Sequence, residues 1–226
     1  MMEIQAYDAR LSGRKGIYQA FDAAGNVIAD ERWRWAYGVD GAIRVDMEIT
    51  RIAPAAEPRH ETISIELGTA MDWRRLVIHA LSGRRECRAD FEPGRVNVCA
   101  RLDTHSRTRE YAWADDCEID YNSALFSMVT RWRTHIKTGE SRPVRVLRLD
   151  AVTFEPGWLN QTLTGMGSEN HATPFGEMQL EHFRRDTSIS EHGEQKQHFW
   201  CDAAGVVFEY AASAGGFRLT AVNFPA

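Results

Sequence analysis

The chain has 226 residues, of which 43% are hydrophobic and 26% are charged, and its formal net charge is −5. These fractions exclude a disordered chain and a polytopic membrane protein, and the acidic balance argues against a dedicated nucleic-acid binder, which normally carries a basic excess. Because large antiparallel sheets often reach about 200–250 residues as one unit, we expect a single domain over residues 1–226.

Short segments with an apolar residue at every second position dominate the sequence, and turn residues separate them at spacings typical of an antiparallel sheet. In chain order the expected strands are 15–21, 27–37, 42–52, 60–67, 72–81, 84–91, 95–103, 106–113, 143–153, 174–184, 196–201, 206–211 and 216–223. The pattern therefore predicts a mainly β protein with one large curved antiparallel sheet, an unclosed barrel of about thirteen strands.

The first clear hairpin joins segments 27–37 and 42–52 through Val39-Asp40-Gly41, in which the glycine suits the left-handed position of a three-residue loop. This register places aromatic residues opposite aliphatic ones, namely Tyr37 with Ile43, Trp35 with Val45 and Trp33 with Met47. We therefore expect these aromatic side chains on the apolar face of the sheet.

A second hairpin turns at Glu92-Pro93-Gly94-Arg95 and has two possible registers. Pairing Phe91 with Val96 creates one continuous apolar face, whereas pairing Cys87 with Cys99 sets aromatic and aliphatic residues against polar ones. We expect the first register and hence free thiols. The four cysteines show no spacing typical of a zinc site, so no metal is expected.

The third hairpin joins segment 95–103, which is also the second strand of the preceding hairpin, to segment 106–113. A four-residue turn at 103–106 predicts that Tyr111 lies opposite Val98 and that Trp113 lies opposite Val96. The apolar face would then continue into the next strand.

Two segments break the strand pattern. Apolar residues at i, i+3, i+4 and i+7 predict a central helix near 123–135, capped by Asn122 or Ser123 and clasped by the sheet; they are Leu125, Met128, Val129 and Trp132. The stretch 154–173 contains Pro156, Gly157, Gly165 and Gly167 and lacks periodicity. We expect it to form a lid or rim loop.

A large sheet curled around one helix either fills its interior with side chains or encloses a cavity. The candidate ligand-binding residues are the aromatic ones at strand spacing: Trp33, Trp35, Tyr37, Trp73, Tyr111, Trp113 and Trp200. The same side chains would pack the helix in a solid core, so both interpretations stay open.

Histidines titrate near neutral pH and supply candidate catalytic groups. The candidates are His79, His182, His198 and Glu209. A four-residue turn would place His198 opposite Glu209, either as a general base with its orienting carboxylate or as an exposed ion pair. No nucleophile elbow, phosphate-binding loop or dinucleotide-binding glycine motif occurs, so no cofactor is expected.

Scattered pieces over roughly residues 115–210 resemble the bacterial glycolipid-binding family and lipoprotein-localisation-factor-like (LolA-like) proteins. They are Asp120-Tyr121-Asn122 before the helix, Arg131-Trp132-Arg133 at its end, and the closing hairpin from Phe199 to Tyr210. The resemblance implies an unclosed barrel that clasps a helix and encloses a hydrophobic cavity for acyl or glycolipid-like molecules. It carries over no site residues.

The first residues lack the basic and apolar regions of a secretory signal, and no run of about 18 apolar residues occurs. We therefore expect a cytoplasmic protein with no integral membrane segment and no nucleic-acid partner. We expect it to bind a hydrophobic or amphiphilic small molecule, of an acyl, glycolipid or polyketide-like kind, in an aromatic-lined barrel cavity. The alternative is a cofactor-independent cyclase or isomerase that acts on a polyketide-like or terpenoid-like substrate in the same cavity. The sequence leaves the oligomeric state open.

Overall fold

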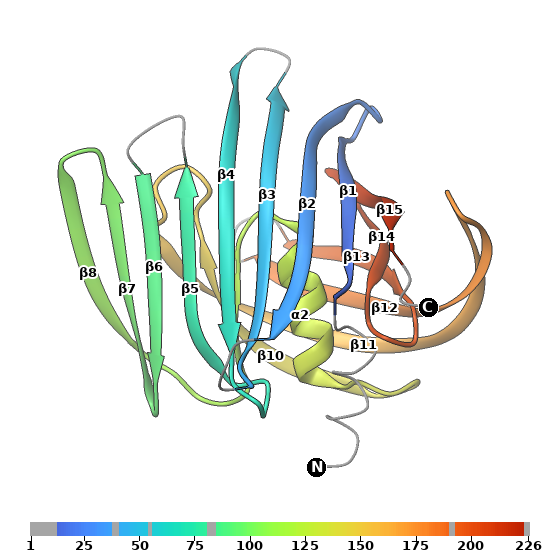
Figure 1. The fold of residues 1–226 in the computed structure, drawn as a ribbon. Helices are drawn as coiled ribbons and strands as arrows, with labels where there is room; N and C mark the ends of the chain where they lie inside the picture. The colour runs from blue at the N-terminus through green and yellow to red at the C-terminus, as the bar shows by residue number, and fades with distance from the viewer. Residues whose placement is uncertain (1–12, 38–40, 54–55, 81–84, 190–192, 224–226) are drawn as a thin grey trace.

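The structure is a computed structural model, and it describes residues 13–37, 41–53, 56–80, 85–189 and 193–223. The strands are β1 Lys15–Asp22, β2 Val27–Tyr37, β3 Ile43–Ala53, β4 Ala56–Leu67, β5 Trp73–Ala80, β6 Arg85–Glu92, β7 Arg95–Leu102, β8 His105–Ala112, β9 Cys117–Asp120, β10 Ser141–Leu149, β11 Pro156–Thr173, β12 Gly176–Ile189, β13 Gly193–Cys201, β14 Val207–Ala212 and β15 Gly215–Val222, and the helix is α2 Ala124–Thr134. In this part of the chain all fifteen strands belong to one sheet (Figure 1).

The sheet consists of two meanders that meet at the β1–β15 pair. Its strand order is β8 to β1 followed by β15 to β9, and all neighbours are antiparallel except β9 and β10. The seam continues past the strands, since the Lys15 amide donates to Asn223 Oδ1 at 2.6 Å and the Asn223 amide donates to the Lys15 carbonyl at 3.1 Å. The curved, unclosed antiparallel sheet expected from the sequence is confirmed.

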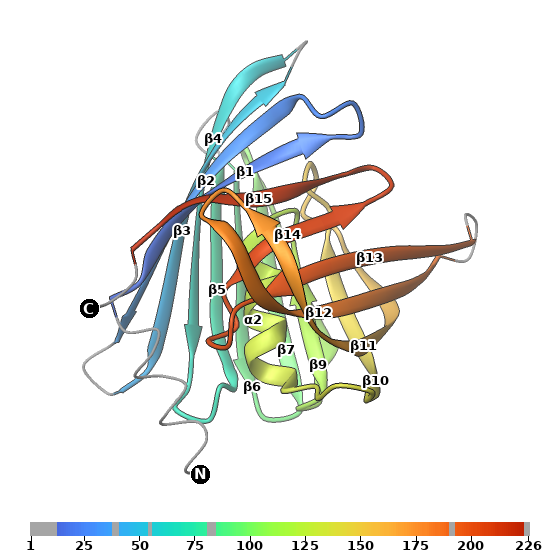
Figure 2. The same cartoon turned by 90° about the vertical axis from the view of Figure 1, so that its right-hand side faces the viewer.

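The sheet curls around α2, and Figures 1 and 2 show the helix on its concave side. Ser123 caps the helix by accepting a hydrogen bond from the Leu125 amide at 3.2 Å, and His135 ends it in a left-handed conformation. Trp132 is fully buried, and its ring meets Trp35 of β2 edge-on at 4.5 Å. The predicted central helix and its cap are thus confirmed. Among the described residues, no helix combines the length and apolar character that a membrane span requires.

Two of the three predicted hairpin registers are confirmed. Trp33 lies opposite Met47, and Phe91 lies opposite Val96, which leaves Cys87 opposite an alanine. All four cysteines are free. The residues 38–40 of the first predicted turn lie outside the described residues.

The third predicted register is wrong by two residues. Leu102 pairs with His105, so Tyr111 lies opposite Val96 and not opposite Val98. Asp103 adopts a positive φ of 55°, which closes a tighter turn than the expected four-residue one. A shift of two residues preserves the face, so Tyr111 still packs against the core.

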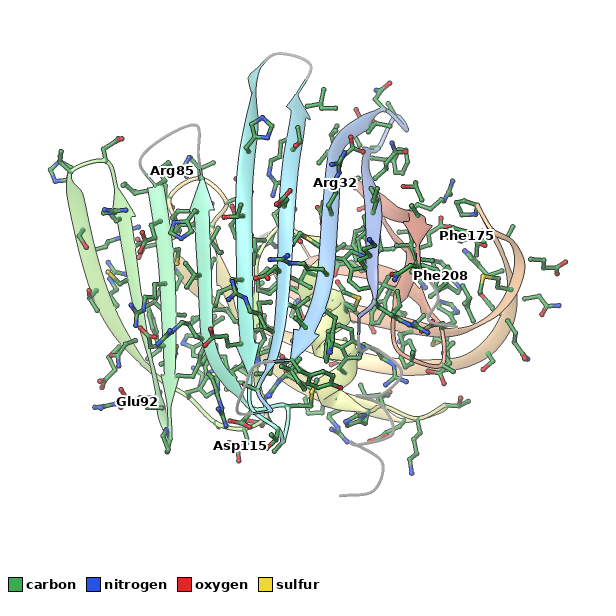
Figure 3. All side chains as sticks on the ribbon, viewed as in Figure 1. Arg32, Arg85, Glu92, Asp115, Phe175 and Phe208 are labelled. Carbon is green, nitrogen blue, oxygen red and sulfur yellow. The ribbon has the colours of Figure 1, made fainter. Side chains whose placement is uncertain are left out.

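The predicted rim loop at 154–173 is also wrong, because this stretch forms β11, an 18-residue strand. At Gly165 the backbone of β11 lies close to the backbone of residues 137–140. The Gly165 amide donates to the Glu140 carbonyl at 3.0 Å, and a Cβ at Gly165 would lie 2.3 Å from the Lys137 carbonyl oxygen. The far end of the β11–β12 hairpin reaches β14, where Phe175 contacts Phe208 at 5.8 Å between ring centroids (Figure 3).

The edges of the sheet, β8 and β9, do not pair with each other in the described residues, and side chains bridge this region instead. Arg107 donates to the Thr153 carbonyl at 3.0 Å and forms an ion pair with Glu155. Arg85, labelled at the start of β6 in Figure 3, donates to the Ala151 carbonyl at 3.4 Å. These side-chain contacts join the two edge regions of the curved sheet in place of backbone hydrogen bonds between β8 and β9.

Candidate functional site

Three neighbouring strands place a charged residue on the inner face of the sheet, near the N-terminal end of α2. Glu31 continues the inward alternation of Trp33 and Trp35 on β2, and Glu61 continues that of the isoleucines on β4. Arg51 on β3 lies two residues beyond Ile49, which pairs with both Glu31 and Glu61. The apolar inner face thus ends in a charged group of three side chains.

Glu31 binds the start of the helix. Its Oε2 accepts a hydrogen bond from the Ala124 amide at 2.9 Å and another from Ser123 Oγ at 3.0 Å. A carboxylate at this position complements the positive end of the helix dipole. Burial nevertheless raises the pKa of the Glu31 carboxyl, and the Ala124 hydrogen bond and the Arg51 charge offset only part of that effect.

Arg51 and Glu61 form a buried ion pair beside Glu31. Arg51 Nη2 lies 3.0 Å from Glu61 Oε2 and also donates to the Asn122 carbonyl at 2.8 Å. The guanidinium therefore connects β3 and β4 to the residue that precedes the helix cap.

Replacing Glu31 by glutamine should change how stability depends on pH. The unfolded carboxyl titrates near 4.5 and the folded one at a higher pH, so within this window the native state holds a proton that the unfolded state releases. The stability contributed by Glu31 is complete below this window and falls as the pH rises through it. Urea unfolding at several pH values measures this effect. As the pH rises above 4.5, the free energy of unfolding of the Glu31→Gln variant should increase relative to that of the wild type. Parallel curves for the two proteins would contradict this prediction.

A cavity of about 230 Å³ opens beside this charged group. We call it the helix-end cavity; β1–β3, the N-terminal end of α2 and β11–β15 all contribute to its lining. One part of its wall is apolar and includes Phe21, Ile28 and Phe217, and the Phe217 ring stacks on Tyr210 at 4.8 Å. Figure 2 shows the C-terminal strands crossing the helix on this side of the molecule.

The wall from β12 and β13 is polar and buried. Arg185 is 7% exposed, and its Nε donates to Gln197 Oε1 at 2.5 Å. Thr187 follows two residues later on the same face and is 2% exposed. Tyr210 approaches Arg185 from β14, and burial raises the pKa of its phenol, an effect that the Arg185 charge partly opposes. The cavity therefore sets hydrogen-bonding groups against an apolar wall.

A second cavity of about 370 Å³ adjoins the first, and Asn122 and Arg148 line both. Its lining also includes the apolar residues Leu149, Trp158 and Leu159. The second cavity thus combines these apolar residues with the charged residues Asp150 and Glu155.

None of the seven aromatic residues expected from the sequence to contact a ligand lines the helix-end cavity. Trp33, Trp35 and Trp73 are at most 4% exposed and pack in the core. Tyr37 is 41% exposed, with its ring against Trp35. Their contact with a ligand stays a prediction.

The other three predicted aromatic residues lie in two further places. Tyr111 and Trp113 join Trp158 in a cluster with centroid distances of 6.4 and 6.2 Å. Through Trp158 this cluster adjoins the second cavity. Trp200 lies on the outer face of the sheet, where its ring stacks on His171 and His182 at 4.5 and 4.8 Å.

The predicted catalytic candidates also lie outside the lining of the helix-end cavity. His182 Nε2 is 2.9 Å from His198 Nδ1, and Glu209 Oε2 is 3.1 Å from His171 Nε2, all on the outer face beside Trp200. His79 is exposed and lies 3.6 Å from a glutamate on β6. Within the described ranges, no group of three or more side chains is arranged to hold a metal ion.

The predicted pairing of His198 with Glu209 is wrong. His198 lies opposite Ala211, and Glu209 lies opposite Trp200. A bulge between Trp200 and Cys201 shifts the register. The turn before β14 is also longer than expected, since the Asp202 amide donates to the Val206 carbonyl at 3.0 Å. The same turn chemistry occurs at Asp22–Asn26, as the repeated Asp-Ala-Ala-Gly sequence suggests.

Comparison with known proteins identifies the fold and no family. No protein-family model matches the chain, and no curated protein matches it. A beta-barrel-like protein of the domain of unknown function DUF1849 from Brucella abortus has a TM-score of 0.62 and 9% identity, covering 96% of this chain and 99% of its own. A DUF1089 family protein from Pseudomonas aeruginosa has a TM-score of 0.53 and 14% identity, covering 80% of this chain and 89% of its own. The chain therefore shares a beta-barrel-like fold with these proteins.

Proposed function

We propose that the protein binds an amphiphilic small molecule at the helix-end cavity. The observation that carries the proposal is the cavity wall itself, in which buried polar side chains such as Arg185 and Thr187 line the same space as Phe21 and Phe217. Polar groups in a pocket orient the ligand, and more than half of the residues that line this cavity are polar. The adjoining second cavity offers room for an apolar tail next to Trp158.

An acyl or glycolipid-like ligand suits this arrangement best. The sequence resemblance to the glycolipid-binding and LolA-like proteins supports it, as does the unclosed barrel around a helix. The cytoplasmic location expected from the sequence belongs to the same proposal, and fractionation of cells that produce the full chain tests it.

Native mass spectrometry of the full chain, purified without detergent, tests binding directly. We expect a bound small molecule, or one-to-one adducts when decanoate or decanol is added. A chain that carries no adduct and shows no saturable binding of either amphiphile would contradict the proposal.

Filling the cavity should weaken binding. Ala212 lines the helix-end cavity, whereas its neighbour Ala211 is on the opposite face of β14. We expect Ala212→Phe to raise the Kd for decanol by about tenfold or more, since the ring takes ligand space, and Ala211→Phe to leave it near the wild-type value. Titration followed by tryptophan fluorescence measures both constants. Equal weakening by both variants would place the ligand elsewhere.

A cofactor-independent cyclase or isomerase is the second candidate function. Glu31 favours it, because a buried carboxyl with a raised pKa at a cavity wall is suited to proton transfer. Mass spectrometry of the molecules that copurify with wild type and with Glu31→Gln separates the two functions. An enzyme would accumulate a different molecule, its substrate, in the variant, and a binding protein would hold the same molecule in both.

A further inference from the structure

We propose that the ligand of the helix-end cavity carries a carboxylate and that Arg185 is the residue that recognises it. The inference rests on the proposed binding function and specifies the chemical class of the ligand.

Buried arginines elsewhere in this protein have carboxylate partners. Arg51 pairs with Glu61 at 3.0 Å, Arg131 with Glu181 at 2.6 Å, Arg133 with Glu118 at 2.8 Å and Arg14 with Asp202 at 2.9 Å. The side chains of these four arginines are 8–14% exposed. Pairing is thus the rule for interior guanidinium groups in this fold.

Arg185 departs from that rule. It is 7% exposed, and its partners in the described part of the chain are the neutral Gln197 and the ring of Tyr210. No described carboxylate forms an ion pair with it. A buried cation without a counter-ion is costly, so a ligand anion at this position would relieve that cost.

Thr187 supplies a second, independent indication. Its Oγ1 is buried and has no hydrogen-bond partner among the described residues, and the side chain lines the same cavity. Alternate residues of a strand share one face, so Arg185 and Thr187 present their polar groups side by side. Unsatisfied buried hydroxyl groups are rare in folded proteins, and a polar ligand would satisfy this one.

The charge of the surrounding wall favours a carboxylate over a phosphate. One guanidinium fork matches the two oxygens of one carboxylate. The lining contains Glu31 and Asp120 together with Arg51, Arg148 and Arg185, so its formal charge is +1, which one carboxylate balances and a doubly charged phosphate exceeds. With Phe21 and Phe217 on the apolar wall, the chemistry fits an organic acid that has an acyl or aromatic body.

Calorimetric titration of the full chain with decanoate and with decanol tests this inference, because the two probes share a chain and differ in charge. We expect decanoate to bind at least tenfold more tightly than decanol. Arg185→Gln should raise the Kd for decanoate by about ten- to a hundredfold, the range expected for a charge-assisted hydrogen bond, and leave decanol nearly unchanged. Arg185→Lys, which keeps the charge and loses the fork, should fall between wild type and Arg185→Gln.

Arg184→Gln is the matched control, since Arg184 is the preceding residue on the opposite face of β12 and pairs with Asp186 at 2.9 Å. It should leave both affinities unchanged. The thermal midpoint of ligand-free Arg185→Gln should equal or exceed that of wild type, whereas a clear loss would show a structural role and overturn the inference.

The two proposals fail in different ways. Equal affinity of wild type for decanoate and decanol, or a copurified ligand without a carboxylate, would overturn the carboxylate inference and leave the binding function standing. Absence of binding for both probes, together with the absence of any copurified molecule, would overturn the binding function, and the inference with it.

Discussion

Replacing Glu118 by alanine is expected to lower the free energy of unfolding by about 3–5 kcal/mol, because removing one partner of a buried ion pair leaves the other charge uncompensated. Glu118 of β9 is 2% exposed and accepts hydrogen bonds from Arg133 Nε at 2.8 Å and from Trp73 Nε1 at 3.1 Å. Arg133 lies near the end of α2, so this group ties the helix to β5 and β9. Its loss should loosen the helix from both strands.

Urea unfolding at pH 8 measures the effect. Burial raises the pKa of Glu118 to about 7, against the opposing charge of Arg133, so the pair is ionised at pH 8. Glu86→Ala is the control, because Glu86 pairs with Arg101 at 2.9 Å but is partly exposed, and such pairs contribute about 0–1 kcal/mol. Similar losses in the two variants would contradict the central role of the buried pair.

Replacing Trp132 by alanine is expected to cost a similar amount, about 3–5 kcal/mol, as is usual when a large core aromatic side chain is removed. Trp132 is fully buried, its Nε1 donates to the Ala204 carbonyl at 3.1 Å, and its ring meets Trp35. The substitution therefore removes apolar contact with β2 and a hydrogen bond to the β13–β14 turn. Domains typically have about 5–15 kcal/mol of stability in total, so the variant should unfold at a much lower urea concentration.

Two further variants separate the causes. Trp132→Phe keeps most of the ring volume and should recover part of the loss, with the missing hydrogen bond accounting for much of the remainder. Trp200→Ala removes a half-buried tryptophan from the outer face and should cost clearly less than Trp132→Ala. If both alanine variants lost equal stability, the helix would not be the centre of the core.

Much of the fold can be read from the sequence because period-two alternation and turn chemistry act locally. The alternation of Trp33, Trp35 and Met47 identified both the strands and the face that points inward, and the structure confirms their register. The helix followed from an apolar stripe that ends in Trp132, together with a serine suited to cap it. In each case neighbouring residues along the chain carry the information.

The missed strands lack this local signal. β9 has four residues, too few to show a period. β11 includes Gly165 and Gly167, and a register shift between them interrupts its pairing with β12. Gly165 owes its place to contact with Lys137, a residue distant in the sequence. Long-range contact of this kind leaves no periodic trace.

The cavity residues were missed for a related reason. A charged residue on a strand normally marks the solvent face. Glu31 and Glu61, however, lie an even number of residues from the buried apolar residues of their strands, so they point to the same inner face. This even spacing is the signal in the sequence that could have identified them. Nothing local to β12 shows that Arg185 lacks a carboxylate partner, because its surroundings come from β13 and β14.

The β1–β15 seam has a consequence for the link between folding and ligand binding. β1 pairs with β2, its neighbour along the chain, and with β15, the most distant in sequence of the described strands. β15 also contributes Gly216 and Phe217 to the wall of the helix-end cavity. The wall of the cavity is therefore complete only when β1 and β15 have paired, and a ligand that binds there stabilises chains in which this long-range pairing has formed. Ligand binding and the closure of this long-range seam are thus thermodynamically linked.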